Sequence, residues 1–223
     1  MVRKSARLQT TGMERKRRQA ARSADTTRAL LTSARALFGK RGYAAVSVDE
    51  VVARAGVTKG AIYHHFRDKR ALLGAVVAEL EGELADEIRT VIADIDDPVD
   101  QLQAGCQVFL DGCLDPIARR IVLLDAPAVL GWQEARGIDM TNGLGIIVAL
   151  LERGMTAGSI RRQPARPLAH LFLGAAIEAG MLIAHAHDPS AERALVATPL
   201  LAWLESLRAN DSPSSRSDGP QGA

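Results

Sequence analysis

The chain has 223 residues, 47% of them hydrophobic and 24% charged, which is enough for one large or two small domains with a buried core. Aromatic residues make up only 4%, so the composition favours helices over sheets. The sequence contains no run of 18 apolar residues and no apolar segment before a cleavage site near its start, so we expect a cytoplasmic protein with no membrane partner.

The formal net charge of +2 conceals two regions of opposite sign. Residues 1–70 contain 17 Lys/Arg and 5 Asp/Glu, whereas residues 71–223 contain 11 and 21. Such a division is expected if only the first part of the chain meets a polyanion, although a run of charge is more often just a solvated surface. The pattern therefore indicates nucleic acid only together with a binding motif.

The first 25 residues contain eight Lys/Arg and few large apolar side chains, so we predict a disordered basic arm over residues 1–23. The arm is either an unstructured tail or an extension that contacts phosphates or the minor groove of DNA.

A helix is predicted from Thr26 or Thr27 to about Arg41, with Gly42 as its stop. Ser47 and Glu50 then have the spacing of a capping box, which starts a second helix that ends at Gly56. Thr58 is predicted to cap a third, short helix with Ala61, Ile62 and Phe66 inside. Two short helices around a glycine-containing turn predict a helix-turn-helix over residues 47–66.

Asp68 is a predicted cap for a long fourth helix from Lys69 to about residue 91. Apolar periodicity predicts further helices at about residues 99–114, 116–125, 140–155, 168–187 and 190–209, with a turn region around Pro127 and Gly131. The fold class is therefore all-α with about nine helices. We predict a DNA-binding domain at 24–84, a ligand-binding and dimerisation domain at 85–209, and a disordered tail at 210–223.

Residues 27–73 resemble the DNA-binding domain of TetR-type transcriptional regulators. The resemblance is carried by Ala34…Leu37-Phe38…Gly42-Tyr43, Ser47-Val48…Val51, Ala55-Gly56-Val57-Thr58-Lys59-Gly60, Tyr63-His64-His65-Phe66 and Lys69…Leu72. The rest of the chain matches such regulators only in helix order and in a loose pattern.

The resemblance implies that the helix at residues 59–65 enters the major groove of double-stranded DNA. The positions that would meet DNA are Ser47, Val48, Thr58, Lys59, Gly60, Ala61, Tyr63, His64, His65 and Lys69. Lys59 is the best candidate for a base-edge or phosphate contact. His65 and Tyr63 could instead brace the domain, and Ala61 could be buried.

The sequence gives little support for catalysis or for a cofactor. No GxSxG nucleophile motif is present, and the glycines at 143 and 145 lack a third glycine and a preceding strand. His185 and His187 are too closely spaced to share a helix face as metal ligands. Cys106 and Cys113 are predicted to be core thiols. We therefore expect no enzyme, no metal and no cofactor.

A largely apolar effector pocket is predicted in the second domain. Its candidate residues are Phe109, Trp132, Met140, Met155, His170, Phe172, Glu178 and Met181, each of which could equally be an ordinary core residue. The resemblance implies an effector there that lowers DNA affinity.

The last two predicted helices carry more apolar surface than one small domain easily buries, which predicts a homodimer through them. A dimer would place two recognition helices about one DNA turn apart on a near-palindromic operator. The sequence thus predicts a repressor, with an activator as the alternative direction of control. The alternatives are a sequence-independent DNA-binding protein, or an all-α ligand-binding protein or enzyme with an incidental basic head.

Overall fold

The protein is described by a computed structural model, which places residues 2–139 and 143–209. In these two ranges the secondary structure is helical, apart from one isolated β-bridge between Ile160 and Arg208. The all-α prediction is confirmed.

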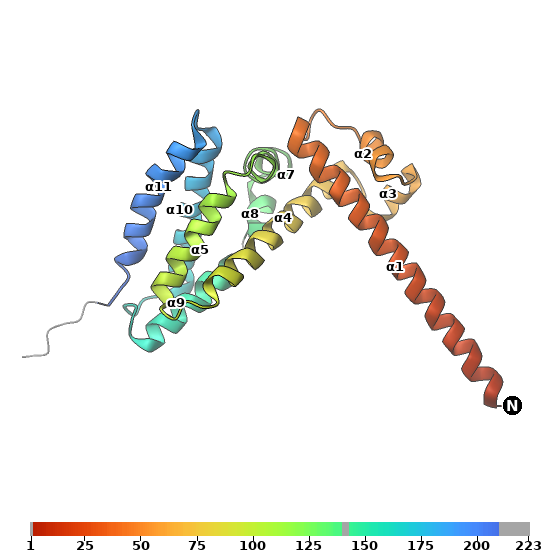
Figure 1. The fold of residues 1–223 in the computed structure, drawn as a ribbon, viewed down its shortest axis with the longest axis horizontal. Helices are drawn as coiled ribbons and strands as arrows, with labels where there is room; N and C mark the ends of the chain where they lie inside the picture. Colours follow the sequence, from red (N-terminus) through yellow and green to blue (C-terminus); the bar gives the residue numbers. More distant parts are fainter. Residues whose placement is uncertain (1, 140–142, 210–223) are drawn as a thin grey trace, which may run out of the picture.

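A head and a body share one long helix (Figure 1). The head consists of α1 (Val2–Arg41), α2 (Val48–Ala55), α3 (Lys59–His65) and the first half of α4 (Lys69–Ile92). The second half of α4 joins the body, with α5 (Pro98–Gly112), α9 (Gly145–Ala157), α10 (Ala165–His185) and α11 (Pro189–Glu205). The head and body are therefore connected without an intervening linker.

Between α5 and α9 the chain forms a series of short helices. These are α6 (Pro116–Ala118), the π-helix η1 (Arg119–Asp125), α7 (Ala126–Leu130) and α8 (Trp132–Asp139). The sequence predicts one helix and then a turn region here. The structure keeps the turn at Gly131, where a positive φ of 78° separates α7 from α8, but folds both flanks into helix.

The predicted disordered arm is the main difference from the sequence-based expectation. Helix α1 begins at Val2, so residues 2–25 continue the head's first helix, which extends away from the rest of the molecule in Figure 1. The segment has no proline and is rich in Arg, Lys, Gln and Ala, which have high helix propensity. Intrinsic propensity therefore favours a helix here, although the segment has few apolar side chains that could pack into a core. The predicted tail at 210–223 lies outside the described residues.

Two apolar clusters hold the protein together. The body cluster joins α5, α9, α10 and α11, and its fully buried members include Val99, Leu110 and Ile183. The head cluster contains Leu30, Phe38, Val51, Ile62 and Leu72 from α1 to α4, but also residues 121, 126, 130 and 135. The head core therefore depends on the short helices of the central segment, beyond the predicted domain boundary at residue 84.

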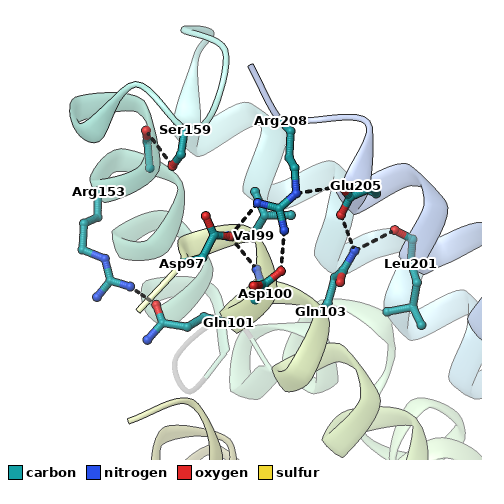
Figure 2. A network of polar contacts seen from close by, with 11 residues as sticks. Asp97, Val99, Asp100, Gln101, Gln103, Arg153, Ser159, Leu201, Glu205 and Arg208 are labelled. Atoms are coloured by element: carbon teal, nitrogen blue, oxygen red, sulfur yellow. Dashed lines mark hydrogen bonds and ion pairs between the residues drawn. The ribbon is translucent and has the colours of Figure 1, made fainter. Parts of the chain in front are cut away.

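A polar network closes one end of the body (Figure 2). Arg208 forms ion pairs with Asp97 at 2.8 Å, with Glu205 at 2.6 Å and with Asp100. Gln101, which is buried, donates to the carbonyl of Ile92 at 2.7 Å. The Arg208 contacts hold the start of α5 against the end of α11, and they therefore help to set the spacing of these two body helices.

The helix α10 is long and apolar enough, by composition, to cross a membrane, but half of the relevant window is buried inside the protein. Such burial is the usual property of a core helix.

Candidate nucleic-acid interface and ligand cavity

The first helix of the helix-turn-helix begins at the predicted capping box. The Glu50 N–H donates to Ser47 Oγ at 3.2 Å, and the Ser47 N–H donates to Glu50 Oε2 at 2.8 Å. Arg41 adds an ion pair to Glu50 at 2.5 Å. The hydrogen bond from the Ser47 backbone, together with Arg41, lowers the pKa of Glu50 to about 2. The carboxylate is therefore ionised, and the start of α2 is fixed, across the physiological pH range.

The turn and the second helix agree with the predicted boundaries, with one correction. Gly56 ends α2 with a left-handed φ of 67°, which a residue with a side chain rarely adopts. Thr58 stands at the N-cap position of α3, but its side chain makes no capping hydrogen bond. The prediction that the Thr58 hydroxyl caps α3 was wrong: the Thr58 backbone has the extended conformation of an N-cap residue, but its hydroxyl accepts no hydrogen bond from the first turn of α3.

Helix α3 presents one exposed face. Lys59, Gly60, Tyr63 and His64 are exposed, at the spacing that places side chains on the same side of a helix, while Ile62 is buried in the head core. Tyr63 is 52% exposed, so it does not brace the head as Ile62 does. Of the other predicted DNA contacts, Ser47 and Thr58 are exposed, and Val48 and Ala61 are half-buried.

His65 and Lys69 make contacts within the head. The Nδ1 atom of His65 lies 3.1 Å from the Thr27 hydroxyl of α1, and its ring contacts the rings of His64 and Phe66. This contact supports the bracing alternative for His65. The Lys69 ammonium lies 4.0 Å from the centre of the Tyr43 ring, in a position to make a cation–π interaction. Partial burial lowers the pKa of Lys69.

Lys59 is also paired. Its Nζ atom lies 2.7 Å from Asp49 Oδ1, so the first residue of α3 is joined to the first turn of α2. The hydrogen bond that the Lys59 ammonium donates to the Asp49 carboxylate raises the pKa of Lys59. The sequence pattern does not predict this ion pair, because the two residues lie on different helices.

A cavity of about 200 Å³ lies in the body, at the border with the head core. Its wall is formed by α4, α5, η1, α7, α8, α9 and α10. Among its lining residues, Val77, Ala126 and Ala135 belong to the head cluster, while Leu102, Phe172 and Ile177 belong to the body cluster. An occupant would therefore touch both parts of the molecule.

The predicted pocket residues divide into three groups. Phe109, Phe172 and Met181 line the cavity. Met155, His170 and Glu178 do not line it: Met155 packs against the body core, His170 is half-buried, and Glu178 is exposed. Met140 and the side chain of Trp132 lie outside the described residues. Helix periodicity alone could not separate the groups, because several faces of α9 and α10 are apolar.

The cavity is also lined by three polar residues that the sequence-based prediction did not include: Glu81, Gln101 and Arg136. Gln101 is internally satisfied, since its amide donates to Ile92 and its side-chain oxygen accepts from Arg153. In the sequence, the position of Glu81 could have indicated a polar residue in the cavity wall. It lies on the apolar face of α4, four residues after Val77 and four before Ala85. A charged residue on an inner helix face often marks a binding site.

Both cysteines are free and buried, as predicted. Burial raises the pKa of each thiol to about 12, so both remain protonated. Cys106 lines the cavity as a small apolar group. Within the described ranges, no group of three or more His, Cys, Asp or Glu side chains is placed to hold a metal ion.

Comparisons with known proteins decide the family. Residues 30–76 match the model of the bacterial regulatory proteins of the tetR family, and residues 99–207 match the tetracyclin repressor-like C-terminal domain. The Transposon Tn10 TetC protein of Escherichia coli is 30% identical over 73% of this chain and 82% of its own length. This chain belongs to the TetR family.

Other relatives match over shorter stretches. The transcriptional regulator TtgR of Pseudomonas putida is 37% identical over 47% of this chain and 51% of its own length. The transcriptional activator FasR of Mycolicibacterium smegmatis is 35% identical over 37% of each chain. The chain thus spans about half or less of the length of these two relatives.

The solved structures agree. A TetR-family transcriptional regulator from Pectobacterium atrosepticum superposes with a TM-score of 0.76 at 32% identity, over 85% of this chain and 97% of its own. The protein RolR in complex with resorcinol has a TM-score of 0.66 at 22% identity, over 82% and 89% of the two chains, which shows the shared fold. The predicted resemblance is confirmed, and the protein is a DNA-binding transcriptional regulator.

The TetR-family body is tied to its head by the short central helices. Asp125, the last residue of η1, accepts the Tyr43 N–H at 2.7 Å, just after α1 ends. From the start of α4, Arg70 donates to the carbonyls of Val129 at 3.2 Å and Leu130 at 2.7 Å, and pairs with Glu134 at 2.7 Å. A single segment therefore lines the cavity on one side and hydrogen-bonds to the head on the other.

Three leucines on the last two helices are exposed. Leu171 and Leu182 on α10 and Leu195 on α11 are 66%, 48% and 67% exposed, whereas the neighbouring Phe172, Ile183 and Leu200 are buried. Large apolar side chains on two adjacent helices are typical of a surface that another protein covers.

Proposed function

We propose that this protein is a homodimeric repressor that binds a near-palindromic operator through α3 and leaves it when a small, largely apolar molecule fills the cavity. The observation that carries the proposal is the position of the cavity, which is bordered by both apolar clusters and by the segment that hydrogen-bonds to the head.

The operator contacts proposed for this chain are Ser47, Val48, Thr58, Lys59, Gly60, Ala61, Tyr63, His64, His65 and Lys69. The exposed face of α3 would read bases, because a recognition helix in the major groove needs projecting polar side chains. His65 and Lys69 would contribute mainly by holding α3 and α4 in place, since both are already engaged with α1 or the α1–α2 connection. Phosphate contacts would make the affinity steeply dependent on salt.

The proposed effector is an apolar molecule with about one or two rings. The cavity of about 200 Å³ is somewhat larger than the roughly 150 Å³ cavity that holds benzene in an engineered protein. Apolar contact would come from Phe109, Phe172, Met181 and their aliphatic neighbours, while Glu81 and Arg136 would orient any polar group of the ligand.

Coupling would follow from a difference in affinity between two conformations. A ligand can shift the head only if it binds one arrangement of head and body more tightly than the other. Since η1 and α7 form part of the cavity wall and hold the head through Asp125 and through the Arg70 contacts, an occupant that displaces them would change the head's orientation. Helix α4 would transmit the same change, because Val77 and Leu84 both line the cavity.

The dimer would form through α10 and α11. The exposed Leu171, Leu182 and Leu195 supply apolar surface on adjacent helices, and two copies could build a four-helix bundle around a two-fold axis. A sedimentation experiment that finds only monomer at micromolar concentration would contradict this part of the proposal.

Repression is preferred over activation, because a protein that covers a promoter needs no contact with the polymerase. Relatives over part of the chain include an activator, FasR, and a transcriptional repressor, BepR of Brucella suis, which is 39% identical over 27% of this chain and 29% of its own length. A reporter fused to the recovered site decides the direction: expression that rises when the regulator is removed supports repression.

Two experiments test the function. Selection of bound sequences from a random DNA pool should recover a motif with two-fold symmetry. Recovered sequences that share no motif would support the sequence-independent alternative. Thermal shift across a panel of apolar compounds should find a ligand that stabilises the protein and releases the operator.

The cavity's role is tested with a matched pair of variants. Ala176→Leu adds carbon atoms to a buried residue of the cavity wall, and it should abolish the ligand's thermal shift while operator binding persists. Ala149→Leu makes the same change on the exposed side of α9 and should leave both unchanged. A ligand that still stabilises Ala176→Leu binds elsewhere.

A further inference from the structure

An acidic side chain lies beside the exposed face of α3 that is proposed to bind DNA. Asp49, in the first turn of α2, forms an ion pair at 2.7 Å with Lys59, the first residue of α3. Both side chains are largely exposed, 67% for Asp49 and 60% for Lys59. The pair therefore sits in water, where a polyanion can reach it.

The acidic side chains nearest to Asp49 in the sequence, Glu50 within the helix-turn-helix and Asp68 just after it, have capping roles that Asp49 lacks. Glu50 completes the capping box and pairs with Arg41. Asp68 accepts the Ala71 N–H and so caps α4. Asp49 makes neither kind of contact with the backbone, and its carboxylate instead engages the cation that is the best candidate for contacting DNA.

The pair has two consequences for a phosphate that approaches α3. The Asp49 carboxylate occupies a hydrogen-bonding position of the Lys59 ammonium, and its negative charge repels the phosphate. Because an exposed ion pair contributes little to stability, the pair opens readily when a better-placed acceptor is available. It acts as a weak internal competitor of DNA.

We propose that Asp49 is a specificity-determining residue, which retains Lys59 in loose complexes with non-operator DNA and releases it only at a site that offers a well-aligned acceptor. Specificity is a difference between affinities, and an element that weakens the wrong complexes raises it as well as one that strengthens the right complex. The inference rests on the operator binding proposed above, but it requires neither a ligand nor repression.

The test measures binding of the full-length protein to a random-sequence duplex over a series of salt concentrations. Asp49→Asn should tighten this binding about two- to fivefold per head, the range set by an exposed ion pair. Because Lys59 would then neutralise a phosphate, the slope of log K against log salt should steepen by about 0.9 per head. On a selected operator the gain should be smaller, so the ratio of specific to non-specific affinity should fall.

Two further variants make the result decisive. Asp86→Asn removes the same charge from an ion pair with Arg89 at 2.6 Å near the C-terminal end of α4, and it should change neither the random-duplex affinity nor the slope. In a Lys59→Gln background, Asp49→Asn should no longer steepen the slope, because there is no ammonium to release.

The proposal is overturned if Asp49→Asn leaves random-duplex binding unchanged, if Asp86→Asn produces an equal gain, or if the steeper slope persists without Lys59. These outcomes are separate from failure of the proposed function. A chain that selects no symmetric motif, or binds no apolar ligand, would defeat the operator or effector proposal and still allow the random-duplex comparison.

Discussion

Replacing Asp125 by alanine is expected to weaken the joint between head and body. In the wild type, the Asp125 carboxylate accepts the Tyr43 N–H at 2.7 Å, and its side chain is only 18% exposed. Alanine has no acceptor, so the N–H that follows the end of α1 would lose its partner. The segment that lines the cavity would then be held to the head by the Arg70 contacts and by apolar packing alone.

The magnitude follows from the charge and the burial of the two groups. A hydrogen bond to a charged acceptor contributes about 1.5–3 kcal/mol, and an unsatisfied buried donor costs about 1–3 kcal/mol. Tyr43 is half-buried, so water can partly replace the lost acceptor, which places the expected loss at about 1–2 kcal/mol. For a chain of this size each kcal/mol corresponds to about 2–4 °C in Tm.

The assay is thermal and urea unfolding of the wild type and the variants at one protein concentration, since a dimer's stability depends on concentration. Asp125→Asn keeps an oxygen acceptor and should lose less than Asp125→Ala. Asp94→Ala, at an exposed position after α4, is the control and should lose nothing measurable. If Asp125→Ala matches the wild type, or if Asp125→Asn loses as much as Asp125→Ala, the hydrogen bond does not hold the head.

Three other changes have expected outcomes. Gly42→Ala forces an alanine to a φ of 78° and crowds the Arg120 guanidinium, so the urea midpoint should fall by the equivalent of about 1–2 kcal/mol. Ser47→Ala removes the capping acceptor of α2 and should cost about 1 kcal/mol, with most of it restored in Ser47→Thr. Burial raises the thiol pKa of Cys106 and Cys113 to about 12, so as pH rises the unfolded chain releases these protons before the folded chain does. The free energy of unfolding is therefore unaffected by these thiols below about pH 8.5. Between about pH 8.5 and pH 12 it falls by up to about 1.4 kcal/mol per pH unit for each thiol. Urea unfolding between pH 8 and 11 should show this slope, and a Cys106→Ala/Cys113→Ala variant should lack it.

The helix-turn-helix was predictable because its signals are local. The Ser47–Glu50 capping box, the left-handed Gly56 and the Asp68 cap each involve residues within a few positions of one another, and all three form as the spacing predicts. Thr58 shows the limit of this reasoning. It occupies the N-cap position, but whether its hydroxyl turns towards the backbone depends on the conformation of the turn.

The cavity was only partly predictable, for a geometric reason. Phe109, Phe172 and Met181 come from helices whose apolar faces are clear in the sequence, and they meet at the cavity. Which face of α9 or α10 looks into the cavity, and which into the ordinary core, is set by how the helices cross. Met155 and His170 have similar local patterns and lie elsewhere.

By itself the amino-acid sequence determined the helical fold, the helix-turn-helix and the concentration of positive charge in the first third, because these depend on propensity, capping and composition. Only the tertiary structure paired Asp49 with Lys59, brought His65 to Thr27, and placed Asp125 on Tyr43 across 82 residues. These contacts join elements whose approach is decided by packing of the two apolar clusters, and no local pattern encodes that approach.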